Sequence, residues 1–409
     1  MQKDFWPNSE ASFAATRQDA LGRLGEFAKT ASRYAKVRNF VVPGHANVSR
    51  LGPAIRHRLI TETEAAKAVL ERYAFSTVEK FLQEIYWRRY WKSWLSMRPQ
   101  VWTEYLSELE ELKGGEEWER AERVMNGDGS VAIMNEFSKE LRETGYLHNH
   151  ARMWFAGYWI HTLRLPWQLG ADFFFRHLLD GDPASNTLSW RWVAGLQTPG
   201  KTYLARRSNI EKYLHPELLN GNEQGLDLLG NPVARDPGEV TRIPPVLKTD
   251  DSLQGDGAPV GLWLHEEDLS AGELMSESGI DQVLITGDEG SWNEHGFSGV
   301  KKAWLKTALD DAAQRCEGHF NGRVALEVSH DREGAVARWA YENGLKRIVA
   351  VRPEVGLVND RFFSLRHMLE KEGVTLAFIE REEDRPIASL GKAGFFPFWK
   401  KASSLVRSL

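Results

Sequence analysis

The sequence predicts an all-α N-terminal domain followed by a Rossmann-like parallel α/β domain. Up to about residue 214, apolar residues recur at helical spacing, as in Leu21, Leu24, Phe27 and Ala28. A stretch rich in Gly, Pro and Asp follows, and beyond it short apolar runs alternate with amphipathic segments. The chain has 409 residues, which exceeds the size at which one hydrophobic core usually stops growing, so two domains are expected.

We place the helical domain at residues 1–219, a linker or long loop at 220–258 and the α/β domain at 259–409. The α/β pattern predicts strands at 260–264, 282–286, 324–328, 347–351 and 375–379, with helices such as 301–316 and 362–371 between them. Strands that alternate with helices favour a parallel sheet. No GxGxxG follows the first of these strands, so the sequence gives no support for a dinucleotide site in this domain.

Composition bounds the class of protein. The single cysteine, Cys316, excludes an internal disulfide and points to a reducing compartment. Residues 1–30 carry no signal-peptide pattern, and no apolar run approaches the roughly 18 residues of a membrane span, so a cytoplasmic protein is expected. Residues 1–215 hold 30 Lys+Arg against 25 Asp+Glu, and the remainder holds 22 against 32. This modest basic excess is compatible with nucleic-acid binding but does not establish it.

Two helical segments carry polar and aromatic side chains on one face each. They are Asn149, Arg152, Met153 and Ala156 in one segment, and Glu84, Trp87, Arg88 and Trp91 in the other. Such polar groups are costly in a helical core unless a ligand supplies hydrogen-bonding partners. A flat ring with a polar edge, such as a flavin, is a ligand of this kind.

Several motifs occur in a specific order. YLHNHARM at 146–153 is followed by Trp167, by LDGD at 179–182 and by ASNTLSWRW at 184–192. This series resembles the central flavin-binding signature of the photolyase and cryptochrome family, in which a WMHNRLRM-like helix precedes IDGD and a WxW element. Upstream, residues 34–39, SRL at 49–51 and EIYWR at 84–88 resemble further segments of that family. The resemblance spans roughly residues 20–192.

The resemblance implies FAD as the cofactor. It assigns FAD binding to Tyr34, Ser49, Arg50, Leu51, Phe81, Glu84, Arg88, Asn149, Arg152, Asp180, Asp182 and Asn186. In this reading Arg152 pairs with Asp180 beside the flavin ring, Asp182 meets its polar edge and Asn186 lies near its N5 atom. Ser49, Arg50 and Leu51 would hold the pyrophosphate.

The resemblance also implies catalytic residues. Glu84 and Asn149 match residues that contact a flipped pyrimidine dimer, Trp87 matches the aromatic ring that stacks on it, and Met153 matches a neighbour of the lesion. An enzyme that acts on a stacked base must extrude it and grip its edge and face, which explains a carboxyl, an amide and an indole together.

Ten of the sixteen tryptophans lie between Trp87 and Trp192, a density that core packing rarely requires. By resemblance, Trp190 and Trp167 are the first two members of a chain that passes electrons from the surface to the flavin. Trp102 is the preferred third member, and Trp118 is the alternative.

The order of the two domains differs from that of ordinary family members, in which the α/β domain comes first. VGLWLHEEDL at 260–269 resembles the family's first strand, and FFPFWKK at 395–401 resembles the element with which the family's α/β domain ends. We therefore expect a circular permutation. The family's first strand runs into a basic segment, whereas residues 265–268 here read HEED, which leaves the presence of an antenna chromophore open.

Less specific interpretations compete with these. Asp180 and Asp182 could cap a helix. Residues 195–202 fit the phosphate-loop pattern GxxxxGK[ST], but that motif requires a preceding buried strand, and residues 189–194 read as helix, so we reject it. His148, His150 and His161 lack metal-ligand spacing. The leading hypothesis is a DNA photolyase that repairs cyclobutane pyrimidine dimers in UV-damaged DNA, and the alternative is a cryptochrome-like blue-light sensor without repair activity.

Overall fold

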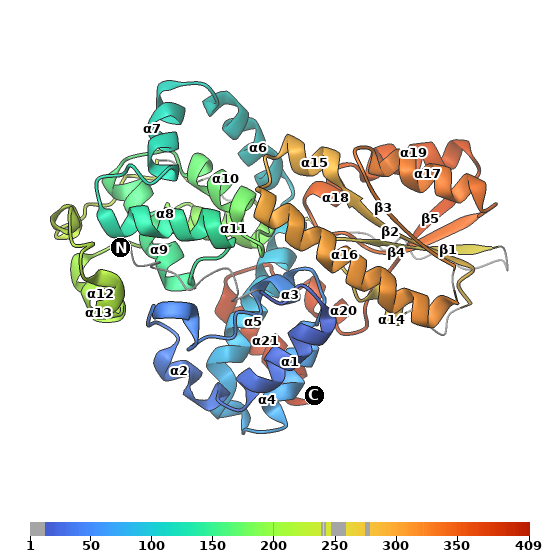
Figure 1. Cartoon of the computed structure of the whole chain (residues 1–409), viewed down its shortest axis with the longest axis horizontal. Helices are drawn as coiled ribbons and strands as arrows, with labels where there is room; N and C mark the ends of the chain where they lie inside the picture. The colour runs from blue at the N-terminus through green and yellow to red at the C-terminus, as the bar shows by residue number, and fades with distance from the viewer. Residues whose placement is uncertain are drawn as a thin grey trace, which may run out of the picture.

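The computed structural model describes residues 13–198, 200–238, 240, 243–246, 259–274, 279–321 and 323–409. A helical part and a part built on a parallel sheet lie side by side (Figure 1). The predicted fold class is confirmed. Of the expected linker at 220–258, residues 239, 241–242 and 247–258 lie outside the described residues.

The helical part accounts for the first half of the chain. Its helices are α1 (Arg17–Ala28), α2 (Tyr34–Val37), α3 (Gly52–Arg56), α4 (Glu62–Leu70), α5 (Phe75–Ser96), α6 (Gln100–Leu112), α7 (Glu116–Met125), α8 (Ala132–Thr144), α9 (Asn149–Gly157), α10 (Trp167–His177), α11 (Pro183–Val193), α12 (Arg207–Tyr213) and α13 (Pro216–Leu219). The longest of these, α5, packs against α2, α4 and α11. This central position lets α5 present side chains both to the candidate site and to the second part of the molecule.

The second part contains a five-stranded sheet in which every pairing is parallel. Its elements are β1 (Val260–His265), α14 (Ala271–Leu274), β2 (Gln282–Asp288), α15 (Glu289–Glu294), α16 (Gly299–Phe320), β3 (Val324–Ser329), α17 (Arg332–Glu342), β4 (Arg347–Val351), α18 (Leu357–Asp360), α19 (Phe362–Lys371), β5 (Thr375–Ile379), α20 (Arg385–Ala388) and α21 (Phe395–Arg407). The strand order is β3-β2-β1-β4-β5. The five predicted strands are confirmed, and the predicted helices at 301–316 and 362–371 correspond to α16 and α19.

Alternate residues of the strands pack against different helices, as the pleat requires. Leu262 and Leu264 share a core with α16, whereas Trp263 between them packs with residues of α17 and α19. Gly261 permits this packing, because a Cβ atom at that position would lie 2.4 Å from the ring of Trp339. Both faces of β1 are therefore buried, as expected for the central strand of a parallel sheet.

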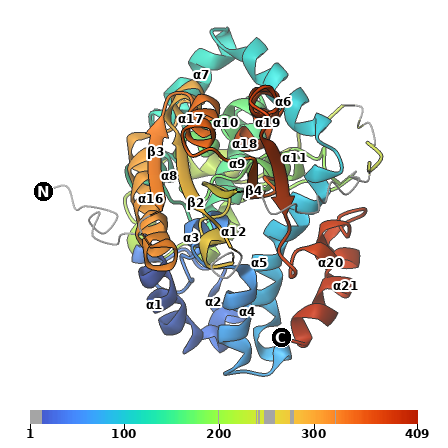
Figure 2. The ribbon, with the colours of Figure 1, turned by 90° about the vertical axis from the view of Figure 1, so that its right-hand side faces the viewer.

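The last two helices return to the helical part. Figure 2 shows α20 and α21 beside α5, and residues of both helices contact it. Phe395 stacks on Trp87 with ring centroids 3.8 Å apart, and the indole N–H of Trp399 donates to Glu79 Oε1 at 3.0 Å. The C-terminal helix is thus part of the core around α5.

The helices bear on two predictions, one about the phosphate-loop pattern at residues 195–202 and one about membrane-spanning segments. Residues 195–198 follow α11 directly, so the prediction that a helix rather than a strand precedes the phosphate-loop pattern is confirmed. Within the described residues, no helix combines the length and the hydropathy needed to cross a membrane.

Candidate functional site

Two helices of the first part converge on one carboxylate. Arg88 of α5 and Arg152 of α9 both approach Asp180, Arg152 with two nitrogens at 3.0 and 3.2 Å and Arg88 at 3.8 Å. Arg88 also reaches Asp182 at 3.3 Å. Because Glu84 precedes Arg88 by four residues and Asn149 precedes Arg152 by three, these two side chains lie about one turn away on the same helix faces.

The loop that carries Asp180 and Asp182 is buried and charged. Burial would raise the pKa of Asp180, but the positive charges of Arg152 and Arg88 lower it. Burial would likewise raise the pKa of Asp182, but Lys92, Arg56 and Arg88 lower it to about 2. Both groups are therefore carboxylates at neutral pH. Asp182 also accepts a hydrogen bond from the backbone N–H of Ala184 as the N-cap of α11, so its capping role and its ion pairs coexist.

The segment that contains Ser49, Arg50 and Leu51 runs close to this loop. Gly52 is needed here, because a Cβ atom at that position would lie 2.6 Å from Asp180 Oδ2. Arg23 of α1 donates from Nε to the carbonyl of Ser49 at 2.5 Å, and Arg50 donates to the carbonyl of Gly44 at 3.3 Å. Within the described part of the chain, neither arginine forms an ion pair.

These two arginines repel each other in the absence of an anion. Burial, and then the charge of Arg50, lower the pKa of Arg23 to about 10. Arg50 Nε is buried without a hydrogen-bond partner. Two adjacent cations without a carboxylate form a suitable site for a phosphate group. Arg23 was not among the predicted residues.

The other wall of the candidate site comes from α2 and α5. The rings of Tyr34 and Phe81 meet edge to face at 5.5 Å. Glu84 forms an ion pair with Arg38 at 2.5 Å, and both side chains are about one-quarter exposed. Burial raises the pKa of Glu84 despite the opposing charge of Arg38. Glu84 is thus easier to protonate than an exposed glutamate, and in that form it can donate a hydrogen bond.

The remaining predicted catalytic residues are partly accessible. Asn149 is exposed at the first turn of α9, and its amide lies 4.0 Å from the sulfur of Met153. Trp87 is half-buried, because one face of its ring is covered by Phe395. A base therefore has no access to the face of Trp87 that Phe395 covers.

Asn186 and the predicted electron-transfer residues lie on α10, α11 and α6. Asn186 donates to the carbonyl of Ala171 at 2.8 Å, and Trp190 contacts Trp159 at 6.2 Å. Trp167 stacks on Tyr105 at 5.4 Å, and Tyr105 in turn contacts Trp102 at 5.5 Å. Trp102 is only 1% exposed and donates its indole N–H to Asp360 of α18. Trp118, the alternative, is partly exposed and packs against Arg176.

The histidines form hydrogen bonds rather than a metal centre. His148 caps α9, His150 bonds the carbonyl of Asn39, and His161 contacts Thr202. Within the described residues, no group of three or more His, Cys, Asp or Glu side chains is arranged so that it could hold a metal ion.

The donor set fits FAD. Arg23 and Arg50 can neutralise its diphosphate, and the buried carboxylates Asp180 and Asp182 can accept hydrogen bonds from a polar ring edge. Tyr34 and Phe81 add an aromatic wall on the side of α2 and α5. The predicted FAD residues therefore come from segments far apart in the sequence. Asp180 lies in one of these segments and is close to three others, through Arg88, Arg152 and Gly52.

Residues 81–215 match the protein family described as the FAD binding domain of DNA photolyase. This match confirms the resemblance to the photolyase and cryptochrome family and establishes FAD as the cofactor. It covers most of α5 and the helices from α6 to α12, and so includes Arg88 and Arg152, which converge on Asp180.

Proteins with similar sequences are named photolyase or cryptochrome. A deoxyribodipyrimidine photo-lyase of Synechococcus sp. is 30% identical over 188 residues, which are 43% of this chain and 38% of that protein. A cryptochrome DASH of Idiomarina loihiensis is 34% identical over 94 residues, covering 23% of this chain and 20% of the relative. A solved class III photolyase from Agrobacterium tumefaciens has a TM-score of 0.43 and 24% identity, and covers 52% of this chain and 45% of its own. The chain thus spans about two fifths of the length of the curated photolyases that it matches.

Proposed function

Because residues 81–215 match the FAD binding domain of DNA photolyase, we propose that this chain is a light-driven photolyase that repairs cyclobutane pyrimidine dimers in UV-damaged DNA. The observation that carries the proposal is the convergence of α5 and α9 on Asp180. It brings the helix faces that carry Glu84 and Asn149 to the same carboxylate, and the names of the relatives agree with this activity.

The side chains have complementary tasks in this proposal. Glu84 and Asn149 grip the polar edge of the extruded dimer, and the raised pKa of Glu84 favours its donation of a hydrogen bond to a pyrimidine carbonyl. Trp87 stacks on one base through the face opposite Phe395, and Met153 packs beside it. Arg38 stays next to Glu84 and keeps its side chain in place.

FAD, when bound in its reduced form and excited by blue light, supplies the electron that splits the dimer. Arg23, Arg50, Arg88, Arg152, Asp180, Asp182 and Asn186 hold and orient it. Trp190 and Trp167, both buried, form the inner part of a path that passes electrons to it, so that the cofactor can be kept reduced.

The test is recovery of thymine absorbance when photoreduced protein and single-stranded DNA containing thymine dimers are exposed to blue light. We expect recovery with the unaltered chain and a loss of at least about tenfold in rate for Glu84→Ala, because the lesion loses a hydrogen-bond partner. Glu71→Gln, which changes an exposed carboxylate at the end of α4, is the matched control and should repair normally. Equal repair by Glu84→Ala would contradict the assigned role.

A second candidate function is a blue-light sensor without repair activity. The stacking of Phe395 on Trp87 favours it, because a repair enzyme gains from an indole that is free to receive a base. The match to a cryptochrome DASH is in keeping with this alternative. A protein that photoreduces its FAD but leaves thymine dimers intact would support the sensor.

We also infer that the two parts stand in permuted order relative to ordinary photolyases. The central strand β1 begins at Val260, where the sequence resembles the family's first strand, and α21 carries the FFPFWKK element that resembles the end of that domain. Helix α21 packs on α5, so the FFPFWKK element joins the α/β part to the helical part. This is the position expected for the end of the α/β domain.

A further inference from the structure

An acidic segment of the α/β part enters the helical part behind the Asp180 loop. It comprises Glu266, Glu267 and Asp268 and follows β1 directly. The backbone of the segment is fixed by His57, whose carbonyl accepts from Leu269 N and whose Nδ1 bonds the carbonyl of Glu266 at 2.6 Å. His57 Nε2 lies 3.2 Å from the carbonyl oxygen of Leu179, the residue before Asp180; burial lowers the pKa of His57 to about 3, so its ring carries one N–H and donates to one of these two carbonyls.

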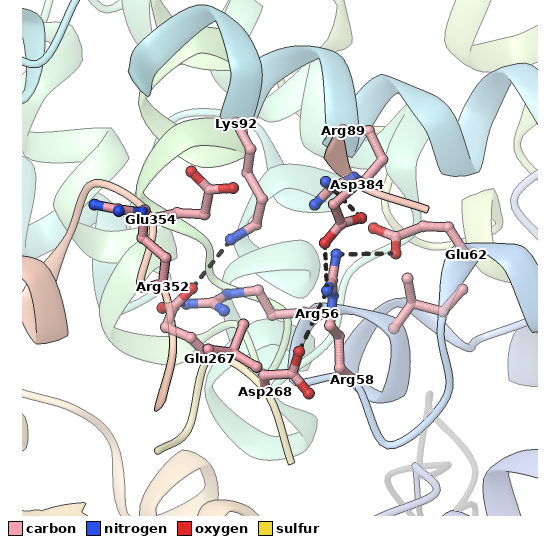
Figure 3. Close-up of a pocket in the computed structure, with 12 residues that line it drawn as sticks. Arg56, Arg58, Glu62, Arg89, Lys92, Glu267, Asp268, Arg352, Glu354 and Asp384 are labelled. Atoms are coloured by element: carbon pink, nitrogen blue, oxygen red, sulfur yellow. Dashed lines mark hydrogen bonds and ion pairs between the residues drawn. The ribbon is translucent and has the colours of Figure 1, made fainter. Parts of the chain in front are cut away.

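Glu267 lies between two cations of the helical part (Figure 3). One carboxylate oxygen pairs with Arg56, and the other accepts from Lys92 Nζ at 3.0 Å. All three side chains are less than 10% exposed. Burial would raise the pKa of Glu267, but the charges of Arg56 and Lys92 lower it, so it stays ionised.

The same two cations act on Asp182. Lys92 Nζ lies 3.8 Å from Asp182 Oδ1, and Lys92 and Arg56 are the leading charges that lower the pKa of Asp182. Lys92 follows Arg88 by four residues, so α5 presents Glu84, Arg88 and Lys92 in one row from the candidate lesion side to the α/β part. Glu267 and Asp182 therefore share Lys92 and Arg56 between them.

A third contact comes from α16. Lys301 Nζ donates to the carbonyl of Phe175 at 2.6 Å and lies so close to the loop that a Cβ atom on Gly181 would be 3.0 Å away from it. Three residues thus lie behind the loop: Lys301 and Glu267 of the α/β part, and His57 of the helical part, which lies between Glu266 and Leu179. Among these, Glu267 is the one that adds a negative charge.

We propose that Glu267 is a positioning residue of the flavin site, which acts from the α/β part by fixing Arg56 and Lys92 and thereby sets the net charge that Asp182 presents to the flavin. This inference rests on the proposed placement of the flavin beside Asp180 and Asp182. A charge close to a flavin changes the relative stability of its oxidised and reduced forms. The α/β part would therefore influence the potential of the flavin through Arg56 and Lys92 of the helical part.

The sign of the effect is specific. Replacement of Glu267 by Gln removes a negative charge, leaves Arg56 and Lys92 with Asp182 alone, and shifts the flavin midpoint potential in the positive direction. Lys92→Gln removes a positive charge and shifts the potential in the negative direction. If Glu267 and Lys92 only stabilised the interface, their replacement would not shift the flavin midpoint potential in opposite directions.

The control is Asp384→Asn. Asp384 bridges Arg58 and Arg89 at 2.7 Å each across the same interface, as Glu267 bridges Arg56 and Lys92, but no contact joins it to Asp182 in the described part of the chain. Asp384→Asn should lower thermal stability by as much as Glu267→Gln and leave the potential unchanged.

The experiment is a spectroscopic redox titration of the FAD-loaded full chain. Opposite shifts in Glu267→Gln and Lys92→Gln, with none in Asp384→Asn, would support the proposal. An unchanged potential in Glu267→Gln overturns it. If Glu267→Gln does not fold, the double variant Lys92→Gln/Glu267→Gln replaces it and removes both partners of the pair. The midpoint potential of the double variant should lie between those of Lys92→Gln and the unaltered chain. A midpoint potential equal to that of Lys92→Gln overturns the proposal.

Failure of the proposed site is recognised separately. If Asp180→Asn and Asp182→Asn also leave the potential unchanged, the flavin does not lie beside this loop, and the site assignment is wrong. If those two variants shift the potential and Glu267→Gln does not, only the role of Glu267 is wrong.

Discussion

Single carboxylates and arginines decide the charge of the candidate site. Asp182 accepts the N-cap hydrogen bond of α11 and, at the same time, balances Arg88. Each function alone is common for an aspartate, and the sequence does not distinguish them, because capping requires only local spacing while ion pairing requires a partner from a distant helix. The residue shows how a structural and a cofactor-binding role can coincide.

The lowered pKa of Asp182 gives a pH dependence. Its pKa falls from 3.8 to about 2 on folding, so the group contributes stability above pH 3.8 that is lost as the pH falls through about 2. We expect Asp182→Asn to be less stable than the unaltered chain at neutral pH by on the order of 2 kcal/mol, with the difference vanishing at low pH. Urea unfolding of both proteins across this pH range measures it; a difference that does not change with pH would contradict the assignment.

Sequence patterns identified most of the residues around Asp180 but missed Arg23, Arg56 and Lys92. The found residues occur in short motifs with fixed spacing, such as LDGD and EIYWR. Arg23 lies on α1, far from any motif, and only the fold brings it to Ser49. Basic residues on helices are usually solvated, so neither composition nor periodicity separates these three from the rest.

Among the elements, the strands were predictable because each is a short, mostly apolar run between amphipathic helices; β1, β2 and β4 are buried on both faces, whereas the edge strand β3 is not. Strand β5 coincides with its predicted range, and β2 extends two residues further, to Asp288. The π-helical turn Tyr158–Thr162 that continues α9 was not predicted, since its residues fit an α-helical pattern equally well. The contact of α21 with α5 was also not predictable, because an amphipathic helix does not reveal its partner.

The packing of α21 on α5 predicts a stability difference between two adjacent residues. Phe395 is 4% exposed and stacks on Trp87, whereas Phe396 is 70% exposed. We expect Phe395→Ala to reduce the free energy of unfolding by roughly 3 kcal/mol or more and Phe396→Ala to change it by less than about 0.5 kcal/mol. Urea denaturation measures both, and similar losses in the two variants would show that α21 does not pack as described.

Helices α6, α10 and α11 carry the proposed electron-transfer chain. Tyr105 stands between Trp167 and Trp102, and this contact favours Trp102 over Trp118 as the third member. We expect Trp102→Phe to remove most of the light-driven reduction of the bound FAD, with Trp118→Phe as the control that retains it. Absorbance changes of the flavin under blue light with an external electron donor measure this, and the reverse result would assign the role to Trp118.

At the scale of the whole molecule, acidic residues of the α/β part and basic residues of the helical part meet at the interface between the two parts. Acidic Glu267, Asp268 and Asp384 of the α/β part meet Arg56, Arg58, Arg89 and Lys92 of the helical part. The acidic residues after β1 differ from the family pattern, in which the first strand runs into a basic segment. Their ion pairs run between the two parts, so this difference is explained by the contact that joins them.

The proposed permutation predicts that the order of the parts is not essential for folding. A chain in which residues 259–409 precede residues 13–246, joined by a flexible Gly/Ser linker, retains every contact between α21 and α5. We expect it to bind FAD with an affinity within about threefold of the unaltered chain. Failure to fold with linkers of several lengths would contradict this expectation.

The flavin is proposed to lie where α5, α9 and the loop carrying Asp180 meet. Fluorescence titration of FAD into apo-protein tests this placement. The variant Asp180→Asn leaves Arg88 and Arg152 without their shared negative charge. The control is Asp172→Asn, because Asp172 forms a similar buried pair with Arg176 on α10. We predict an FAD affinity at least about tenfold weaker for Asp180→Asn and unchanged for Asp172→Asn. An unchanged affinity in a folded Asp180→Asn variant would contradict the account.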